Sequence, residues 1–155
     1  MRSFTTVLLV TLSLTAHLAA QNTILVQGGG AALQQAVDAA RPGDTLDVRA
    51  ARYSGVVVGK GITVRCAAGV VVENTQGAAL RIDGVPPGET LQVRGGRFVG
   101  GGFLGDPPLK VERCVGTVVL DRVLPVSASV LIGTLALEGN PGPVVLRGLD
   151  VGVDD

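Results

Sequence analysis

A short apolar segment recurs in the second half of the chain, and this repeat restricts the fold more than any other feature of the sequence. Its copies LRIDG, LKVER and LALEG begin at Leu80, Leu109 and Leu135, so the period is 29 and then 26 residues. Apolar and polar residues alternate in each copy, as in a strand with one buried face. A repeat of this length predicts stacked units that bury their apolar faces against one another.

Two further apolar segments follow each copy. After a turn that contains glycine, the second segments lie at residues 91–94, 118–121 and 144–147. Looser third segments lie at 98–99, 130–132 and 149–151. Three short strands per period suit one coil of a parallel β-helix, whose coils stack about 4.8 Å apart. A β-sandwich also has short alternating strands, but it gives no reason for like residues to recur at like places.

The N-terminal part of the mature chain predicts a strand and then a helix. Residues 23–26 form an apolar run that three glycines end. Apolar residues then recur at the spacing of one helical face, at Leu33, Ala36, Val37 and Ala40. A phosphate-binding loop is a poor alternative. Leu33 stands where the third glycine or alanine of the dinucleotide-binding fingerprint would fall, and no Gly-Lys-Ser/Thr follows. We expect a helix over residues 31–41 that caps the first coil.

Residues 1–20 have the features of a secretory signal peptide. Arg2 supplies a positive charge, and the apolar stretch up to Leu18 is too short to span a membrane comfortably. Leu18-Ala19-Ala20 resembles a small-residue cleavage site, whereas the alternative is a buried N-terminal helix. No later segment has the ~18 continuous apolar residues of a spanning helix. We expect a mature protein without a membrane span that is secreted, periplasmic or held at the cell surface.

Composition excludes several kinds of function. His17 is the only histidine and leaves with the signal peptide, which removes Ser-His-Asp and Cys-His catalysis and histidine-ligated zinc. The 13 basic and 13 acidic residues balance without a basic run, so the sequence predicts no nucleic-acid partner. Aromatic residues, on which sugars usually stack, are scarce in the mature chain: Tyr53, Phe98 and Phe103. Phe98 and Phe103 flank a glycine run where they could be exposed, but a core role is the simpler interpretation.

One region of the sequence resembles a known superfamily. The segment AVDAARPGDTL at residues 36–46, with Tyr53-Ser54-Gly55 and KGITV at 60–64, resembles the opening of pectate-lyase-like, right-handed β-helix repeat proteins. In that superfamily a helix closes the first coil, a Pro-Gly-Asp turn enters the first strand, and a tyrosine precedes the next. The resemblance covers residues 31–65 and continues only as the repeat. It implies a scaffold and does not specify an activity.

The predicted fold is therefore all-β: a short right-handed parallel β-helix with an N-terminal capping α-helix. We divide the chain into a signal peptide at 1–20, a strand and cap helix at 21–44, and β-helix coils at 45–155. A further hypothesis is that the coils are an incomplete stretch of a longer solenoid, because no cap is evident in the sequence after residue 150. An open last coil, with Leu146, Leu149 and Val151 beside a free strand edge, predicts edge-to-edge self-association.

Stacking the copies aligns Asp83, Glu112 and Glu138 in one acidic column on the outer surface. Carboxylates this close repel one another unless they are protonated, paired with cations or bound to a metal ion. Calcium, which takes several oxygen ligands, could bridge neighbouring coils, and pectate lyases likewise hold calcium on acids from adjacent coils. The simpler interpretation is that Arg81 and Lys110, two residues earlier, neutralise the column.

A second outward column contains Arg65, Arg94, Asp121 and Arg147. An arginine acts as the general base in some lyases of the superfamily. The simpler interpretation is an ion-pair ladder in which Asp121 lies between Arg94 and Arg147, which would add little stability.

Exported proteins usually pair their cysteines, but we expect no disulfide between Cys66 and Cys114. Cys66 follows a strand that aligns with the second strands, whereas Cys114 follows a first strand, so the two belong to different sides of the coil. If the two instead shared a column two coils apart, they would stand about twice ~4.8 Å from each other, beyond the ~4.4–6.8 Å between Cα atoms that a disulfide needs. Burial as small apolar residues explains both.

These features favour a secreted structural or interaction module without identifiable catalytic or cofactor-binding residues. The alternative is a carbohydrate-binding or carbohydrate-active protein, calcium-assisted and with polysaccharide as its partner. As an enzyme it would be a polysaccharide lyase or glycoside hydrolase of the pectin-lyase-like superfamily.

Overall fold

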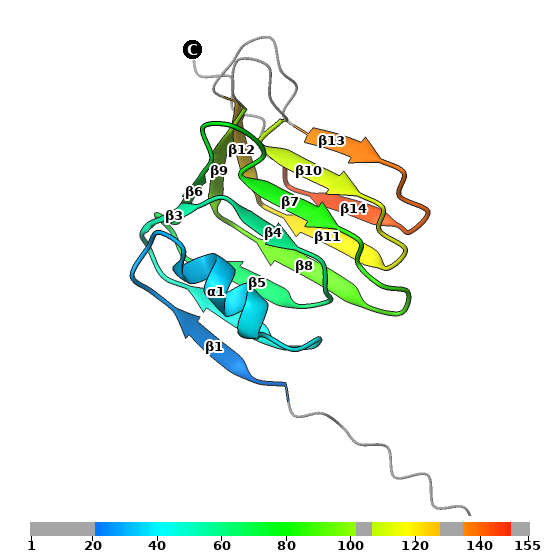
Figure 1. Ribbon diagram of the computed structural model, residues 1–155, viewed down its shortest axis with the longest axis horizontal. Coiled ribbons are helices and arrows are strands. Elements are labelled where there is room, and N and C mark those ends of the chain that lie inside the picture. Colours follow the sequence, from blue (N-terminus) through cyan, green and yellow to red (C-terminus); the bar gives the residue numbers. More distant parts are fainter. Residues whose placement is uncertain (1–20, 102–106, 128–134, 150–155) are drawn as a thin grey trace, which may run out of the picture.

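A computed structural model describes residues 21–101, 107–127 and 135–149. In this part of the chain, fourteen strands form three parallel sheets that stack from β1 to β14 (Figure 1). Sheet A contains β1 (Thr23–Val26), β2 (Thr45–Val48), β5 (Thr63–Cys66), β8 (Thr90–Arg94), β11 (Thr117–Asp121) and β14 (Val144–Arg147). Sheet B contains β3 (Arg52–Ser54), β6 (Val71–Glu73), β9 (Arg97–Gly100) and β12 (Leu124–Ser127). Sheet C contains β4 (Val56–Val58), β7 (Leu80–Asp83), β10 (Leu109–Glu112) and β13 (Leu135–Glu138).

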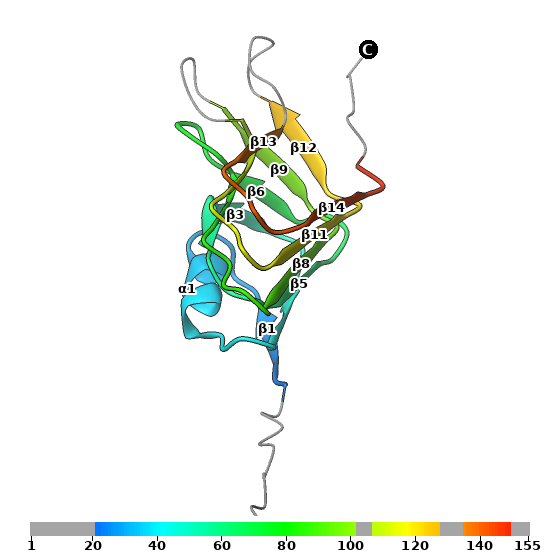
Figure 2. The same cartoon turned by 90° about the vertical axis from the view of Figure 1, so that its right-hand side faces the viewer.

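The chain visits sheets A, B and C in the same order in each turn, from β2 to β13, and this is a parallel β-helix. The three sheets enclose a common interior, and β14 begins a further turn on sheet A (Figure 2). The predicted register is confirmed, because Leu109 pairs with Leu80 and with Leu135. The second strands align as expected too, with Val118 beside Leu91 and Val144.

The predicted third strand of the fourth turn is wrong. The strand that pairs with β9 is β12, with Pro125 beside Phe98, and not the apolar stretch at 130–132, which lies outside the described residues. The sequence misled because proline cannot donate a hydrogen bond and usually indicates a turn. β12 is the last strand of sheet B, and such an edge position tolerates proline. The corner before it is only two residues long, so the strand starts earlier than the apolar pattern suggests.

Apolar side chains from the three sheets fill the interior in columns that run from turn to turn. On sheet C the inward column contains Val58, Ile82 and Val111, each at most 1% exposed. Phe98 is also buried, as expected for a core residue, whereas Phe103 lies outside the described residues. Full burial of each such side chain contributes about 1.5–3 kcal/mol. In the last strands the same columns open to solvent, with Leu137 51% and Leu146 43% exposed, and self-association there stays a prediction.

The helix α1 (Ala32–Ala39) occupies the place of a sheet C strand below β4 (Figure 1). It is shorter than the predicted 31–41 and ends before the Pro-Gly turn. Leu33 and Val37 face the core and are almost fully buried, which confirms the capping helix. Among the described residues, no helix is long and apolar enough to cross a membrane.

Gln34 joins α1 to the edge of sheet C in the manner of a neighbouring strand. Its side-chain Oε1 accepts a hydrogen bond from the Val57 amide at 2.8 Å, and its Nε2 donates to the Val57 carbonyl at 3.2 Å. On the other side of β4, Val57 is paired in register with Arg81 of β7. The glutamine amide therefore satisfies both backbone groups that a missing strand would leave free.

The end of α1 is fixed by two charged side chains. Lys60 donates to the carbonyls of Val37 and Ala40, each at 2.9 Å, which satisfies carbonyl groups that the helix leaves without partners. The Asp44 carboxylate accepts hydrogen bonds from the amides of Arg41 and Asn22, which lower the pKa of Asp44. These contacts hold the Pro-Gly-Asp turn that leads into β2.

We predict that Gln34→Ala lowers the free energy of unfolding by about 1 kcal/mol, because two hydrogen bonds that close the β4 edge are lost. Gln35→Ala is the matched control, since Gln35 is the exposed neighbour on the same helix. Urea unfolding followed by circular dichroism measures both changes. Equal effects of the two substitutions would contradict a capping role for Gln34.

Candidate functional site

The three carboxylates predicted to align on sheet C do so. Glu112 of β10 lies in register with Asp83 of β7 and with Glu138 of β13. Each follows a residue of the inward column, Ile82, Val111 or Leu137, and therefore faces the outer surface. Their exposure differs, because the Asp83, Glu112 and Glu138 side chains are 22%, 10% and 60% accessible to solvent.

The cations expected to neutralise this acidic column are in contact with it. The Arg81 Nε donates to Glu112 Oε1 at 2.5 Å, and Arg81 Nη2 lies 3.5 Å from Asp83. The Lys110 Nζ lies 3.4 Å from Glu112 and 3.6 Å from Glu138. Each cation thus joins carboxylates of two neighbouring coils, which is the predicted ion-pairing arrangement.

Arg113 is a further partner that the sequence analysis missed. It donates two hydrogen bonds to the Asp83 carboxylate, one of them from Nε at 2.9 Å, and this pairing lowers the pKa of Asp83. Arg113 has a φ of 54°, a left-handed conformation that the corresponding Gly84 and Gly139 adopt without strain. The signal in the sequence was an arginine at a position where the other two copies have glycine.

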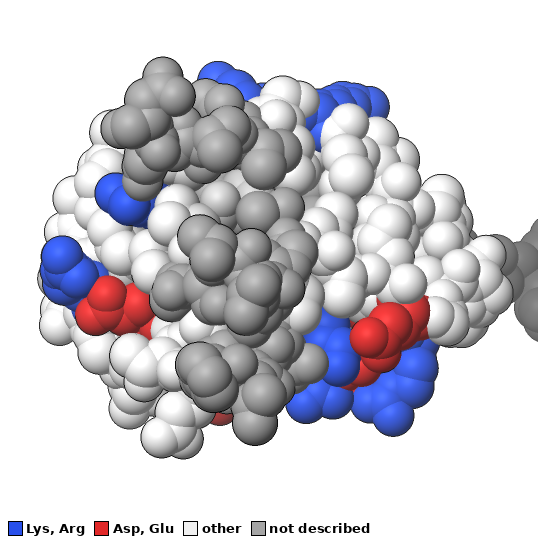
Figure 3. All heavy atoms as spheres, turned by 90° about the horizontal axis from the view of Figure 1, so that it is seen from above, with Lys and Arg blue, Asp and Glu red and all other residues white. Residues whose placement is uncertain are grey.

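Calcium binding by the acidic column stays a prediction. A calcium ion would have to take carboxylate oxygens that now accept hydrogen bonds from Arg81 and Arg113. In residues 21–101, 107–127 and 135–149, no group of three or more His, Cys, Asp or Glu side chains is arranged to hold a metal ion. Seen from above, basic atoms lie beside acidic atoms at two places on the rim of the molecule (Figure 3).

The second predicted column also aligns, on sheet A. Arg94 lies in register with Arg65 and Asp121, and Asp121 with Arg147. The Arg94 Nε donates to Asp121 Oδ2 at 2.9 Å, which confirms half of the predicted ladder. The other half is wrong, because the second cation at Asp121 is Arg122, 3.5 Å away, and not Arg147. Arg122 starts the corner after β11 and reaches the carboxylate from the side.

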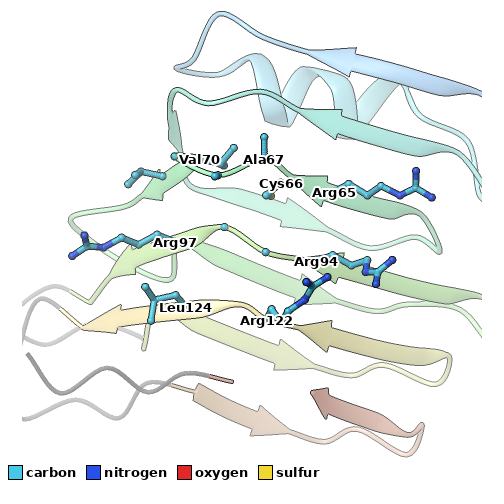
Figure 4. Close-up of a pocket in the computed structure, with 13 residues that line it drawn as sticks. Arg65, Cys66, Ala67, Val70, Arg94, Arg97, Arg122 and Leu124 are labelled. Atoms are coloured by element: carbon cyan, nitrogen blue, oxygen red, sulfur yellow. The ribbon is translucent and has the colours of Figure 1, made fainter. Parts of the chain in front are cut away.

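A surface groove lies where sheet A turns into sheet B, and we call it the corner groove. Its volume is about 660 Å³. Four arginines line it, together with small and apolar residues of three successive corners (Figure 4). The arginines are Arg65, Arg94, Arg97 and Arg122. Sequence analysis had noted only the first two, because Arg97 and Arg122 stand outside the repeated strand positions.

The two cysteines lie on different sides of the coil, as the register predicted. Cys66 ends β5 of sheet A and lines the corner groove, whereas Cys114 follows β10 of sheet C and is fully buried. Both are free thiols in the structure. Burial raises the pKa of the Cys66 thiol to about 12, so at neutral pH it is a weak nucleophile.

Comparison with known proteins gives no family assignment. No protein-family model, curated protein or solved structure matches the chain. The proposed function therefore rests on the sequence and on the described residues.

We predict that Glu112→Gln lowers the free energy of unfolding by about 1–3 kcal/mol, because Arg81 and Lys110 lose their shared, nearly buried carboxylate. Glu138→Gln, at the exposed end of the same column, should cost less than about 1 kcal/mol. Urea unfolding at pH 7 measures both. A Glu138 variant as unstable as the Glu112 variant would show that burial does not set the strength of these pairs.

A second prediction concerns the thiols. In the folded protein iodoacetamide should label Cys66 slowly at pH 8, because its raised pKa leaves little thiolate. In denaturant without reductant, mass spectrometry should find two labels per chain. Cys66→Ser, which should take one label, is the control. A monomer that takes no label and has a two-hydrogen mass deficit would place the two cysteines in a disulfide.

Proposed function

We propose that the chain is an exported, non-catalytic β-helix module of the pectate-lyase-like kind that binds a partner through its outer faces. The signal-like N-terminus supports export, and the similarity over residues 31–65 supports the superfamily. The parallel β-helix with its helical cap is the scaffold that this similarity implies.

The proposal that the module is non-catalytic is supported by the direction in which the pKa values of its ionisable groups are shifted. Acid–base catalysis at neutral pH is most efficient when the pKa of the catalytic group lies near neutrality. Among the described residues, the groups with clear shifts move away from it: the pKa of Asp44 and Asp83 is lowered, and that of Tyr53, Cys66 and Arg113 is raised. The acidic column is held by cations, as in a structural ladder.

The alternative function is a carbohydrate-binding or carbohydrate-active protein that uses calcium on sheet C. It is favoured by the alignment of Asp83, Glu112 and Glu138 on adjacent strands, with Glu138 largely exposed at one end. A cation there would replace Arg81 and Lys110 as the neutralising charge. As an enzyme, such a protein would be a polysaccharide lyase or glycoside hydrolase.

Two measurements distinguish the two functions: the melting temperature with and without calcium, and product formation from a uronic-acid polymer. For the non-catalytic module we predict no change in melting temperature when millimolar calcium is added after a chelator, and no unsaturated or shortened products from polygalacturonate. Because the cations already neutralise the column, calcium gains little there. A calcium-dependent rise in melting temperature that Glu112→Gln abolishes, together with product formation, would favour the alternative.

A further inference from the structure

We propose that the corner groove between sheets A and B binds a ligand that carries sulfate or phosphate esters, held by Arg65, Arg97 and Arg122. The inference names a ligand class for the binding module proposed above and therefore rests on that proposal. It concerns a different face from the acidic column of sheet C.

The groove has the shape for an extended ligand. It crosses the corners of three successive turns. Arg65 lies one residue before the end of a sheet A strand, Arg97 begins a sheet B strand in the next turn, and Arg122 lies in the corner of the third. Neighbouring turns are about 4.8 Å apart. Small residues line the space between the arginines: Cys66, Ala67, Ala68, Gly69, Gly95 and Gly96. Figure 4 shows Arg97 on one side of these residues and Arg65 and Arg94 on the other.

The protein balances the charge of the groove only in part. Asp47 of β2 lies in register with Arg65, but among the described residues it lies outside the groove and forms no ion pair with Arg65. No carboxylate lines it, and within the described residues no ion pair involves Arg65 or Arg97. The nearby Asp121 is 15% accessible to solvent and is shared by Arg94 and Arg122. On sheet C, by contrast, Arg81, Lys110 and Arg113 all have carboxylate partners. Positive charge in a chain whose formal net charge is zero is therefore concentrated where an anion could enter.

The backbone of Arg122 gives an independent indication. Its φ is 54°, and the corresponding corner positions before and after it are Gly95 and Gly148, at 68° and 55°. Backbone hydrogen bonds show that these positions correspond. The Gly95 amide donates to the backbone carbonyl of Asp121, and the Arg122 amide donates to the backbone carbonyl of Arg147, one turn further on. Glycine takes this left-handed conformation without strain, whereas a side chain makes it costly.

An internal contact explains the same strain at Arg113 but not at Arg122. Arg113 donates two hydrogen bonds to Asp83. Among the described residues, the one ion pair of Arg122 is a 3.5 Å contact with Asp121, whose carboxylate already accepts a hydrogen bond from Arg94. The Arg122 side chain is 70% exposed. Backbone strain that no intramolecular contact offsets is often found at functional positions. The strained residue places a guanidinium at the rim of the groove (Figure 4).

The arginines favour tetrahedral oxyanions over carboxylates. A guanidinium presents a planar fork of donors that binds two oxygens at once. A carboxylate has two oxygens in one plane, whereas a sulfate or phosphate monoester has three terminal oxygens around a tetrahedral centre and can contact guanidiniums from adjacent turns. Such esters also stay ionised across the physiological pH range. An extended chain with repeated esters would place several of them along the groove.

Binding of four soluble polymers to the purified protein tests the proposal: dextran sulfate, dextran phosphate, polygalacturonate and neutral dextran. We expect titration calorimetry to detect dextran sulfate or dextran phosphate binding that weakens as sodium chloride is raised. Polygalacturonate should bind at least about tenfold more weakly, and dextran not at all. Which ester polymer binds more tightly identifies the source of the oxyanion.

Three variants locate the site. The double variant Arg65→Gln/Arg97→Gln should weaken binding at least about tenfold. Arg52→Gln removes the same kind of charge from an exposed ion pair with Glu73 outside the groove, and it should bind like the wild type. Arg122→Gly should bind more weakly while its melting temperature stays the same or rises, because glycine relieves the strain. A purely structural role for Arg122 would not separate binding from stability in this way.

The inference is overturned if the double variant binds like the wild type, if Arg52→Gln loses as much affinity, or if none of the ester polymers binds. It is also overturned if polygalacturonate binds as tightly as the ester polymers. Degradation of any polymer, measured by its length after incubation, would instead contradict the non-catalytic function proposed above. The two failures are therefore distinguishable in one set of samples.

Discussion

Each turn of this solenoid depends on the turns above and below it, because a strand of three to five residues cannot bury an apolar face by itself. Backbone hydrogen bonds between turns fix the register, and the register forces like side chains into columns. Inside, the columns are aliphatic and continuous, as in the run Val58–Ile82–Val111. Outside, the same constraint places charges directly over one another, so any like-charged column needs a solution to repulsion.

The protein solves this repulsion differently on two faces. On sheet C, cations two residues before or one residue after the acids reach a carboxylate in a neighbouring turn, and each carboxylate of the column has at least one cationic partner. At the corner between sheets A and B, positive charge is left facing a groove instead. On sheet C every carboxylate of the column has a cationic partner. At the corner groove, Arg65 and Arg97 form no ion pair within the described part of the chain. This difference between faces is why we place a ligand at the corner groove.

The sequence predicted those parts of the structure that repeat. Periodicity located Asp83, Glu112 and Glu138 at equivalent positions, and the helical spacing of Leu33 and Val37 located the cap. It failed at β12, because the periodic pattern is interrupted by Pro125, which an edge strand tolerates. It also missed Arg97, the first residue of β9, and Arg122, which lies in a corner, because neither belongs to the repeated alternation of apolar and polar residues. Only the packing of neighbouring corners shows that these arginines share one groove.

The side-chain amide of Gln34 makes the two edges of sheet C different. By occupying the free amide and carbonyl of Val57, it leaves the β4 side of sheet C with no vacant partner at that residue. β13, at the opposite edge of sheet C, has no such cover from α1, which contacts only the first turns. Within the described part of the chain, a strand supplied by another polypeptide could therefore pair with β13 but not with Val57 of β4, so the two edges of sheet C differ in what they can accept.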